Sequence, residues 1–220
     1  MAQQQQEGSR TLGFFEENQK VILGTITGIL ILVIGFILYH HLIKKPREAE
    51  AVNAIYVAEM QFERDSFENA LLNPGAGNMG FLDVIDEYKG TSAANLAKYY
   101  AGISYLKLGR YEAAVSYLED FKAKGKITPI TKYGALGDAY SELEQYSKAI
   151  SAYKKAVNSS KNSFLTPYYL KKLGMLYELQ ENYKEALNAY QKIKDDFPDS
   201  PDGLNIEKYI DNIVYNQGAQ

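Results

Sequence analysis

The stretch LGDAYSELEQYSKAISAYKKA, residues 136–156, is the clearest copy of a pattern that recurs along the chain. A Gly followed three residues later by Tyr marks one predicted helix, and a Tyr followed three residues later by Ala begins the next. Two further copies carry the same residue types, one around Gly102 and Ala114 and the other around Gly174 and Ala186. The glycines lie 35 and 37 residues apart, and the alanines repeat with the same two steps. This period predicts stacked helix–turn–helix units.

The pattern resembles the tetratricopeptide repeat, a helix–turn–helix of about 34 residues. The resemblance implies an all-α fold in which three repeats, residues 95–199, stack into a short superhelix. In such packing small residues lie where two helices cross, and tyrosines fill the wider gaps with their hydroxyls at the edge. Each helix pair then buries its apolar face only against its neighbours.

The segments that flank the repeats also have helical spacing. Residues 44–94 predict an irregular helical pair whose second helix is interrupted by a Gly-rich loop, Asn73–Gly80, because this loop is dense in turn formers. Residues 200–220 predict a capping helix, from Ser200 through Val214, and a tail. The apolar positions of that helix are Leu204, Ile206, Tyr209, Ile210 and Ile213.

A second decisive feature is the uncharged apolar run Val21–Ile43. As a helix its 23 residues would span about 34 Å, enough for a hydrocarbon core of about 30 Å. The run is longer than the apolar part of a cleaved signal peptide, and Lys44, Lys45 and Arg47 follow it as a stop-transfer cluster. The sequence therefore predicts a single transmembrane helix, residues 21–43, in contact with membrane lipid. Residues 1–20 form a separate N-terminal segment.

The predicted span carries small residues on one side. Gly24 and Gly28 form a GxxxG pattern, and Gly35 lies two turns further along the same face. In lipid, small residues let two helix backbones approach closely, so these glycines are candidates for a contact with another membrane helix. The alternative is that they are ordinary glycines of a membrane helix.

The composition argues against catalysis and against nucleic acid as a partner. The 24 Lys and Arg residues nearly balance the 27 Asp and Glu residues, and no basic patch stands out. Cysteine is absent, and histidine occurs only at positions 40 and 41. Because zinc sites and nucleophile–base pairs need such residues, we expect no catalytic, metal or cofactor site. The chain is expected to be a non-enzymatic interaction protein.

The resemblance to tetratricopeptide repeats also indicates a binding surface, because the first helices of such repeats line a concave face. Three Lys or Arg residues placed to clamp a carboxylate are missing from the corresponding positions. The apolar stretch of the first copy could instead bury against the helical pair before it. The candidate partner-binding residues are Leu96, Tyr99, Ile103, Leu106, Asp138, Ser141, Tyr168, Lys171 and Met175, with Thr131, Gly134 and Glu178 at equivalent positions.

The segment Phe14-Phe15-Glu16-Glu17-Asn18-Gln19-Lys20, followed by a Gly-containing span, resembles the start of the YfgM-like family of ancillary Sec translocon subunits. The resemblance implies a bacterial inner-membrane protein with residues 1–20 in the cytoplasm and the repeats in the periplasm. It also implies association with the Sec translocon, a PpiD-type periplasmic chaperone and client proteins. The charges that flank the span, by contrast, lean slightly towards cytoplasmic repeats. The alternative is a scaffold or receptor subunit of another envelope machine, with a cytoplasm-facing repeat domain.

Overall fold

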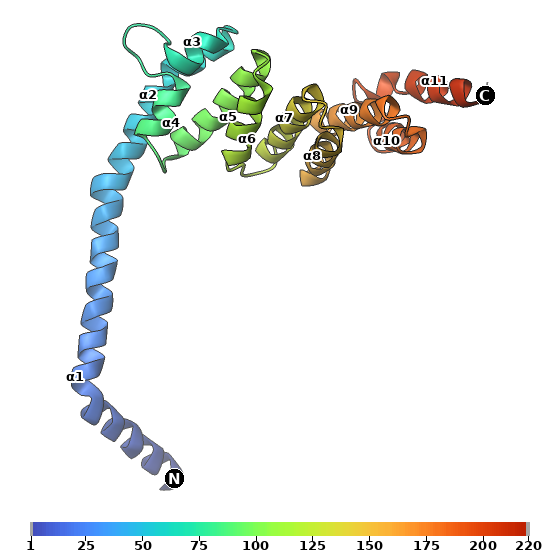
Figure 1. The fold of residues 1–220 in the computed structure, drawn as a ribbon. Coiled ribbons are helices and arrows are strands. Elements are labelled where there is room, and N and C mark those ends of the chain that lie inside the picture. Colours follow the sequence, from blue (N-terminus) through green and yellow to red (C-terminus); the bar gives the residue numbers. More distant parts are fainter. Residues whose placement is uncertain (1, 219–220) are drawn as a thin grey trace. The chain divides into compact units, whose positions relative to one another are not determined.

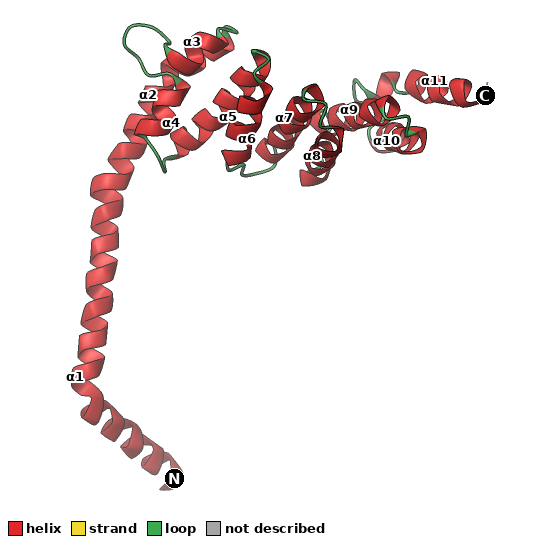
Figure 2. Ribbon diagram, in the orientation of Figure 1, coloured by secondary structure: helices red, strands yellow, loops and turns green. Residues whose placement is uncertain are grey.

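The computed structural model describes the backbone of residues 2–218 and the side chains of residues 17–215. Every regular element in that part of the chain is a helix (Figure 2). The chain divides into two compact units, Met1–Glu50 and Ala51–Gln220.

The described part of the first unit is helical, and its last helix continues past Glu50. Helix α1 covers Ala2–Tyr39, a π-helical turn η1 covers His40–Lys44, and α2, Lys45–Glu63, begins directly after it. From Glu17 onward this helical run is long and apolar enough to cross a membrane. The apolar side chains of the predicted span 21–43 are exposed, apart from that of Ile22, which is partly buried. The predicted division at residue 20 has no counterpart in the secondary structure, because α1 has already begun at Ala2.

The second unit consists of helices that follow one another in antiparallel pairs (Figure 1). In α5 to α10 each helix packs against the next one along the chain, as stacked repeats require. After α2, the helices are α3 (Phe67–Leu72), α4 (Phe81–Glu87), α5 (Ser92–Lys107), α6 (Tyr111–Asp120), α7 (Thr128–Glu142), α8 (Tyr146–Ser159), α9 (Leu165–Leu179), α10 (Tyr183–Asp196) and α11 (Glu207–Gly218), with a 3₁₀ turn at Gly203–Asn205.

The predicted glycines lie where helices cross. A Cβ added to Gly137 on α7 would lie 2.4 Å from Cδ1 of Tyr153 on α8, which is inside van der Waals contact. Gly102 meets Leu118 in the same way, and Gly174 meets Tyr190. The three glycines therefore let the second helix of each pair press its large side chain onto the backbone of the first.

The three repeat turns share one hydrogen-bonding pattern, and a fourth turn has it as well. The N–H of Gln145 donates to the carbonyl of Tyr140, and Glu144 between them has a positive φ of 56°. Between α2 and α3 the N–H of Ser66 donates to the carbonyl of Gln61, and Asp65 has φ 57°.

Small buried residues accompany this fourth turn. Ala58 on α2 and Ala70 on α3 occupy the positions that Gly137 and Ala149 hold in the second repeat, and both alanines are fully buried. The α2–α3 pair is thus built like a repeat. The Gly-rich loop then separates the short α3 from α4, as the sequence predicts, while the turn at Asp65 is an addition to that prediction.

The C-terminal helix starts later than the sequence predicts. Ser200 caps a 3₁₀ turn by accepting a hydrogen bond from the N–H of Gly203 at 2.9 Å, and α11 begins only at Glu207. Ile206 and Ile213 are buried against the last repeat, with Tyr209 and Ile210 packed beside them. Leu204 is 74% exposed, because the 3₁₀ turn shifts it out of the apolar stripe of α11.

Candidate functional site

A groove of about 740 Å³ runs across the first helices of the three repeats. Helices α5, α7 and α9 supply most of its walls, and side chains from the second helices reach it at Tyr111 and Tyr153. Its apolar lining includes Ile103 and Leu106 on α5 and Leu179 on α9. The groove therefore joins residues that are far apart in the sequence, as a surface shared by several repeats should.

Most of the candidate residues lie in this groove. Those that line it are Tyr99, Ile103, Leu106, Thr131, Asp138, Ser141 and Met175. Met175 is 48% exposed, so its thioether is available to a partner.

The other candidates lie elsewhere. Leu96 lines a separate pocket next to α4, Lys171 forms an ion pair with Asp202, and Tyr168 packs edge-on against Tyr169 with ring centroids 5.0 Å apart. Glu178 accepts a hydrogen bond from the hydroxyl of Tyr190.

The centre of the groove is polar and internally paired. The ammonium of Lys172 donates to Oδ1 of Asp138 at 2.7 Å, and the hydroxyl of Tyr153 donates to the same oxygen at 2.5 Å. Burial and the Asp138 carboxylate raise the pKa of Tyr153 well above its usual range, so the phenol stays a neutral donor. Burial lowers the pKa of Lys172, but Asp138 and Tyr168 together outweigh burial and the net shift is upward. The groove centre thus presents no unpaired charge from these groups.

Several groove residues are absent from the sequence-based set, notably Tyr153, Tyr169 and Lys172. Tyr169 reaches the groove because Gly134 leaves room for it: a Cβ at Gly134 would lie 2.0 Å from Cζ of the Tyr169 ring. A glycine on one first helix, followed one repeat later by a tyrosine on the next, is the signal that could have found this contact.

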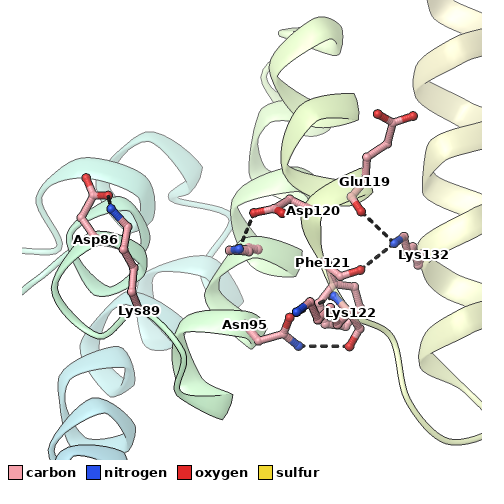
Figure 3. A network of polar contacts seen from close by, with 9 residues as sticks. Asp86, Lys89, Asn95, Glu119, Asp120, Phe121, Lys122 and Lys132 are labelled. Atoms are coloured by element: carbon pink, nitrogen blue, oxygen red, sulfur yellow. Dashed lines mark hydrogen bonds and ion pairs between the residues drawn. The ribbon is translucent and has the colours of Figure 1, made fainter.

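The pocket that contains Leu96 is braced by polar contacts around the connection from α6 to α7 (Figure 3). The amide of Asn95 donates to the carbonyl of Lys122 at 3.1 Å and accepts from the N–H of Lys122 at 2.9 Å. Lys132 donates to the carbonyls of Glu119 and Phe121, which satisfies acceptors at the end of α6. These contacts position the repeat helices, so we assign this pocket a structural role rather than a binding role.

The candidate membrane-helix contact is open. Gly24, Gly28 and Gly35 have no atom within 4 Å of the place where a Cβ would be. Their face of α1 is therefore accessible to another helix along its full length.

Sequence profiles of the tetratricopeptide repeat match residues 96–124, 133–163 and 172–200. These matches fall on the pairs α5–α6, α7–α8 and α9–α10. No curated protein matches the chain. The fold and the groove define an all-helical repeat protein, a class that works through protein–protein contacts. More particularly, the repeats are tetratricopeptide repeats, preceded by one helix that is able to span a membrane.

Proposed function

We propose that this chain is a non-enzymatic, membrane-anchored interaction subunit that holds a segment of a partner protein in its concave groove. The observation that carries the proposal is the groove itself, which is open, lined by all three repeats and more apolar than polar. Asp138 and Lys172 neutralise each other at its centre. A partner therefore gains more from burying apolar side chains there than from presenting a free carboxylate.

The anchor contributes through tethering. A domain fixed to a membrane meets a partner on the same membrane at an effective concentration that can reach millimolar, so a modest groove affinity suffices. The exposed face of Gly24, Gly28 and Gly35 supports direct packing beside another membrane helix. Replacing Gly28 with Ile should weaken that packing and reduce the recovery of membrane partners. If the recovery of membrane partners is unchanged, packing through this glycine face is not part of the function.

For the partner, we propose the Sec translocon together with a PpiD-type periplasmic chaperone and its clients, at the bacterial inner membrane. The support is the resemblance of Phe14–Lys20 to the YfgM-like family; the side chains of Phe14, Phe15 and Glu16 lie outside the described residues. In this arrangement the N-terminus is cytoplasmic, and the repeats receive proteins as they leave the translocon.

The groove is tested by photo-crosslinking in cells. A benzophenone side chain at Met175 should capture a partner, whereas the same group at Leu204, which is exposed but outside the groove, should not. Mass spectrometry of the captured protein then separates translocon and chaperone subunits from other envelope machines. Equal capture at both positions would rule out the groove as the binding surface.

The orientation is tested by protease protection. If the repeats are periplasmic, protease added after the outer membrane is opened should digest them while the inner membrane is intact. Digestion only after the inner membrane is permeabilised would instead favour the alternative, a cytoplasm-facing scaffold or receptor. The groove result and the orientation result are independent of each other.

A further inference from the structure

A second concavity, of about 390 Å³, lies on the opposite side of α7 from the groove. Asp138 and Ser141 of α7 face the groove, whereas Tyr133, Leu136 and Tyr140 line the second concavity, as expected for positions half a helical turn apart. Lysines from α7 and α8 stand around it: Lys132, Lys148 and Lys155. We call this site the lysine pocket.

The lysines are held over aromatic rings. The ammonium of Lys148 lies 5.4 Å from the centre of the Tyr140 ring, and those of Lys155 and Lys132 lie 5.6 and 5.7 Å from the centre of the Tyr133 ring. These contacts position the charges without neutralising them. Glu119 is the one acid in the lining, and it accepts a hydrogen bond from the Tyr140 hydroxyl at 2.6 Å.

The second repeat differs from its neighbours at most of these lysine positions. At the position of Lys148, the first repeat has Ala113 and the third has Glu185. At the position of Lys132, the corresponding residues are Ala97 and Tyr169. At the position of Lys155 they are Asp120 and Lys192, so among the three repeats only the second has a lysine at all three positions. The pKa of Lys132 is lowered mainly by burial, with Lys155 acting in the same direction and Glu119 and Asp120 acting against it.

We propose that the lysine pocket binds an acidic peptide segment of a partner protein. Its apolar floor, Leu136 and Ala152, suits an aliphatic side chain, and its rim of ammonium groups suits the carboxylates beside that side chain. A nucleic acid is a poorer fit, because the chain as a whole carries a net charge of −3 and the pocket itself supplies only three lysines. The site lies away from the groove and does not rest on the function proposed for it.

The test uses the full chain in nanodiscs of zwitterionic lipid and a fluorescent peptide of alternating Glu and Leu. Binding is followed by fluorescence anisotropy, with a Gln–Leu peptide for comparison. The Glu–Leu peptide should bind more tightly, and raising the salt concentration should weaken its binding because exposed charges are screened. Equal binding of the two peptides would overturn the proposal.

Variants then locate the site. Lys148→Glu/Lys155→Glu should weaken binding by about tenfold, since two attractive contacts become repulsive. Lys148→Arg/Lys155→Arg should retain it. The matched control Lys184→Glu/Lys192→Glu makes the same charge change on α10 and should leave binding unchanged. An equal loss in that control would show a general charge effect and overturn the proposal, with circular dichroism confirming that each variant is folded.

A benzophenone on the peptide separates this pocket from the groove. Crosslinks should map to α7 and α8, while crosslinks confined to α5 and α9 would place the peptide in the groove and contradict the proposal. Displacement by inorganic pyrophosphate, at an ionic strength where NaCl does not displace the peptide, would identify a phosphate site instead.

Discussion

Asp138 on α7 and Lys172 on α9 form an ion pair, with Oδ1 and Nζ 2.7 Å apart, that links the second repeat to the third inside the groove. Their side chains are 24% and 29% exposed, so the pair is only partly screened by water. Asp138 also accepts the hydroxyl of Tyr153, which ties together three helices through one carboxylate.

Removing this carboxylate should destabilise the repeats. We expect Asp138→Ala to lower the free energy of unfolding by about 2 kcal/mol, because it leaves Lys172 and Tyr153 without their acceptor. A double-mutant cycle of Asp138→Asn with Lys172→Met, measured by urea unfolding, should give a clear coupling energy. The exposed pair Asp86–Lys89 serves as control and should give almost none. Equal coupling in both pairs would contradict the role of burial.

Adding a methyl group at a helix crossing should also destabilise the fold. Gly137→Ala places a Cβ 2.4 Å from the Tyr153 ring, and we expect a loss of about 1–3 kcal/mol from overpacking. Ser116→Ala, on the exposed side of α6, should change stability by less than about 0.5 kcal/mol. Thermal unfolding of both variants measures the difference in stability. If Gly137→Ala is as stable as the parent, helices α7 and α8 can move apart without a loss of stability.

The repeat turns offer a stabilising change. Glu144 holds a positive φ of 56° at the position where the first repeat has Gly109, and this conformation is unfavourable for a residue with a Cβ. Glu144→Gly should therefore raise the free energy of unfolding by up to about 1 kcal/mol. Lys154→Gly, inside α8, should lower it by about 1 kcal/mol. If both substitutions destabilise equally, the turn is not strained.

Glu59 on α2 predicts a pH dependence. Burial and the nearby Glu63 raise the pKa of Glu59 above its ordinary value of 4.5, despite a hydrogen bond from Tyr100 that lowers it. The folded state thus favours the protonated carboxyl. The resulting contribution to the free energy of unfolding is present below pH 4.5 and is lost as the pH rises through the pKa of the folded state. Glu59→Gln should be more stable than the parent at pH 7, and the difference should shrink as the pH falls to 4.5. Urea unfolding of both proteins across that pH range measures this difference in stability. A stability gain that does not change with pH would point to a cause other than the Glu59 carboxyl.

The fold follows from the sequence where packing is periodic. Gly102, Gly137 and Gly174 mark the helix crossings because close contact tolerates only a small residue there, and the profile matches fall on the same pairs. The turn at Asp65 is harder to see, because Ala58 replaces the glycine and Gln61 replaces the tyrosine of the other copies. The late start of α11 follows a 3₁₀ turn whose first residue, Gly203, donates to the Ser200 hydroxyl, and a helical pattern alone does not reveal this turn.

The groove is only partly predictable for a related reason. Helix periodicity places Tyr99 and Ile103 on one face of α5, and Asp138 on the corresponding face of α7, whatever side chains surround them. The presence of Tyr153 and Tyr169 depends on how far a ring reaches past a glycine on another helix, which is a property of the assembled repeats. Lys171 forms an ion pair with Asp202 outside the groove, whereas Tyr168 packs against the groove residues Tyr169 and Lys172 without lining the groove itself.

Among the described residues of the second unit, the buried side chains form three clusters rather than one. One lies within α2 to α5 around Phe81, a small one around Leu118 joins α5 to α8, and the largest extends from α7 to α11 around Tyr190. Because the cluster within α2 to α5 shares no helix with the C-terminal cluster, we expect the C-terminal repeat to open and exchange its amide hydrogens while α2 to α5 remain closed. We therefore expect that the part of the groove formed by α9 can be released and re-formed without unfolding the helices nearest the anchor in sequence.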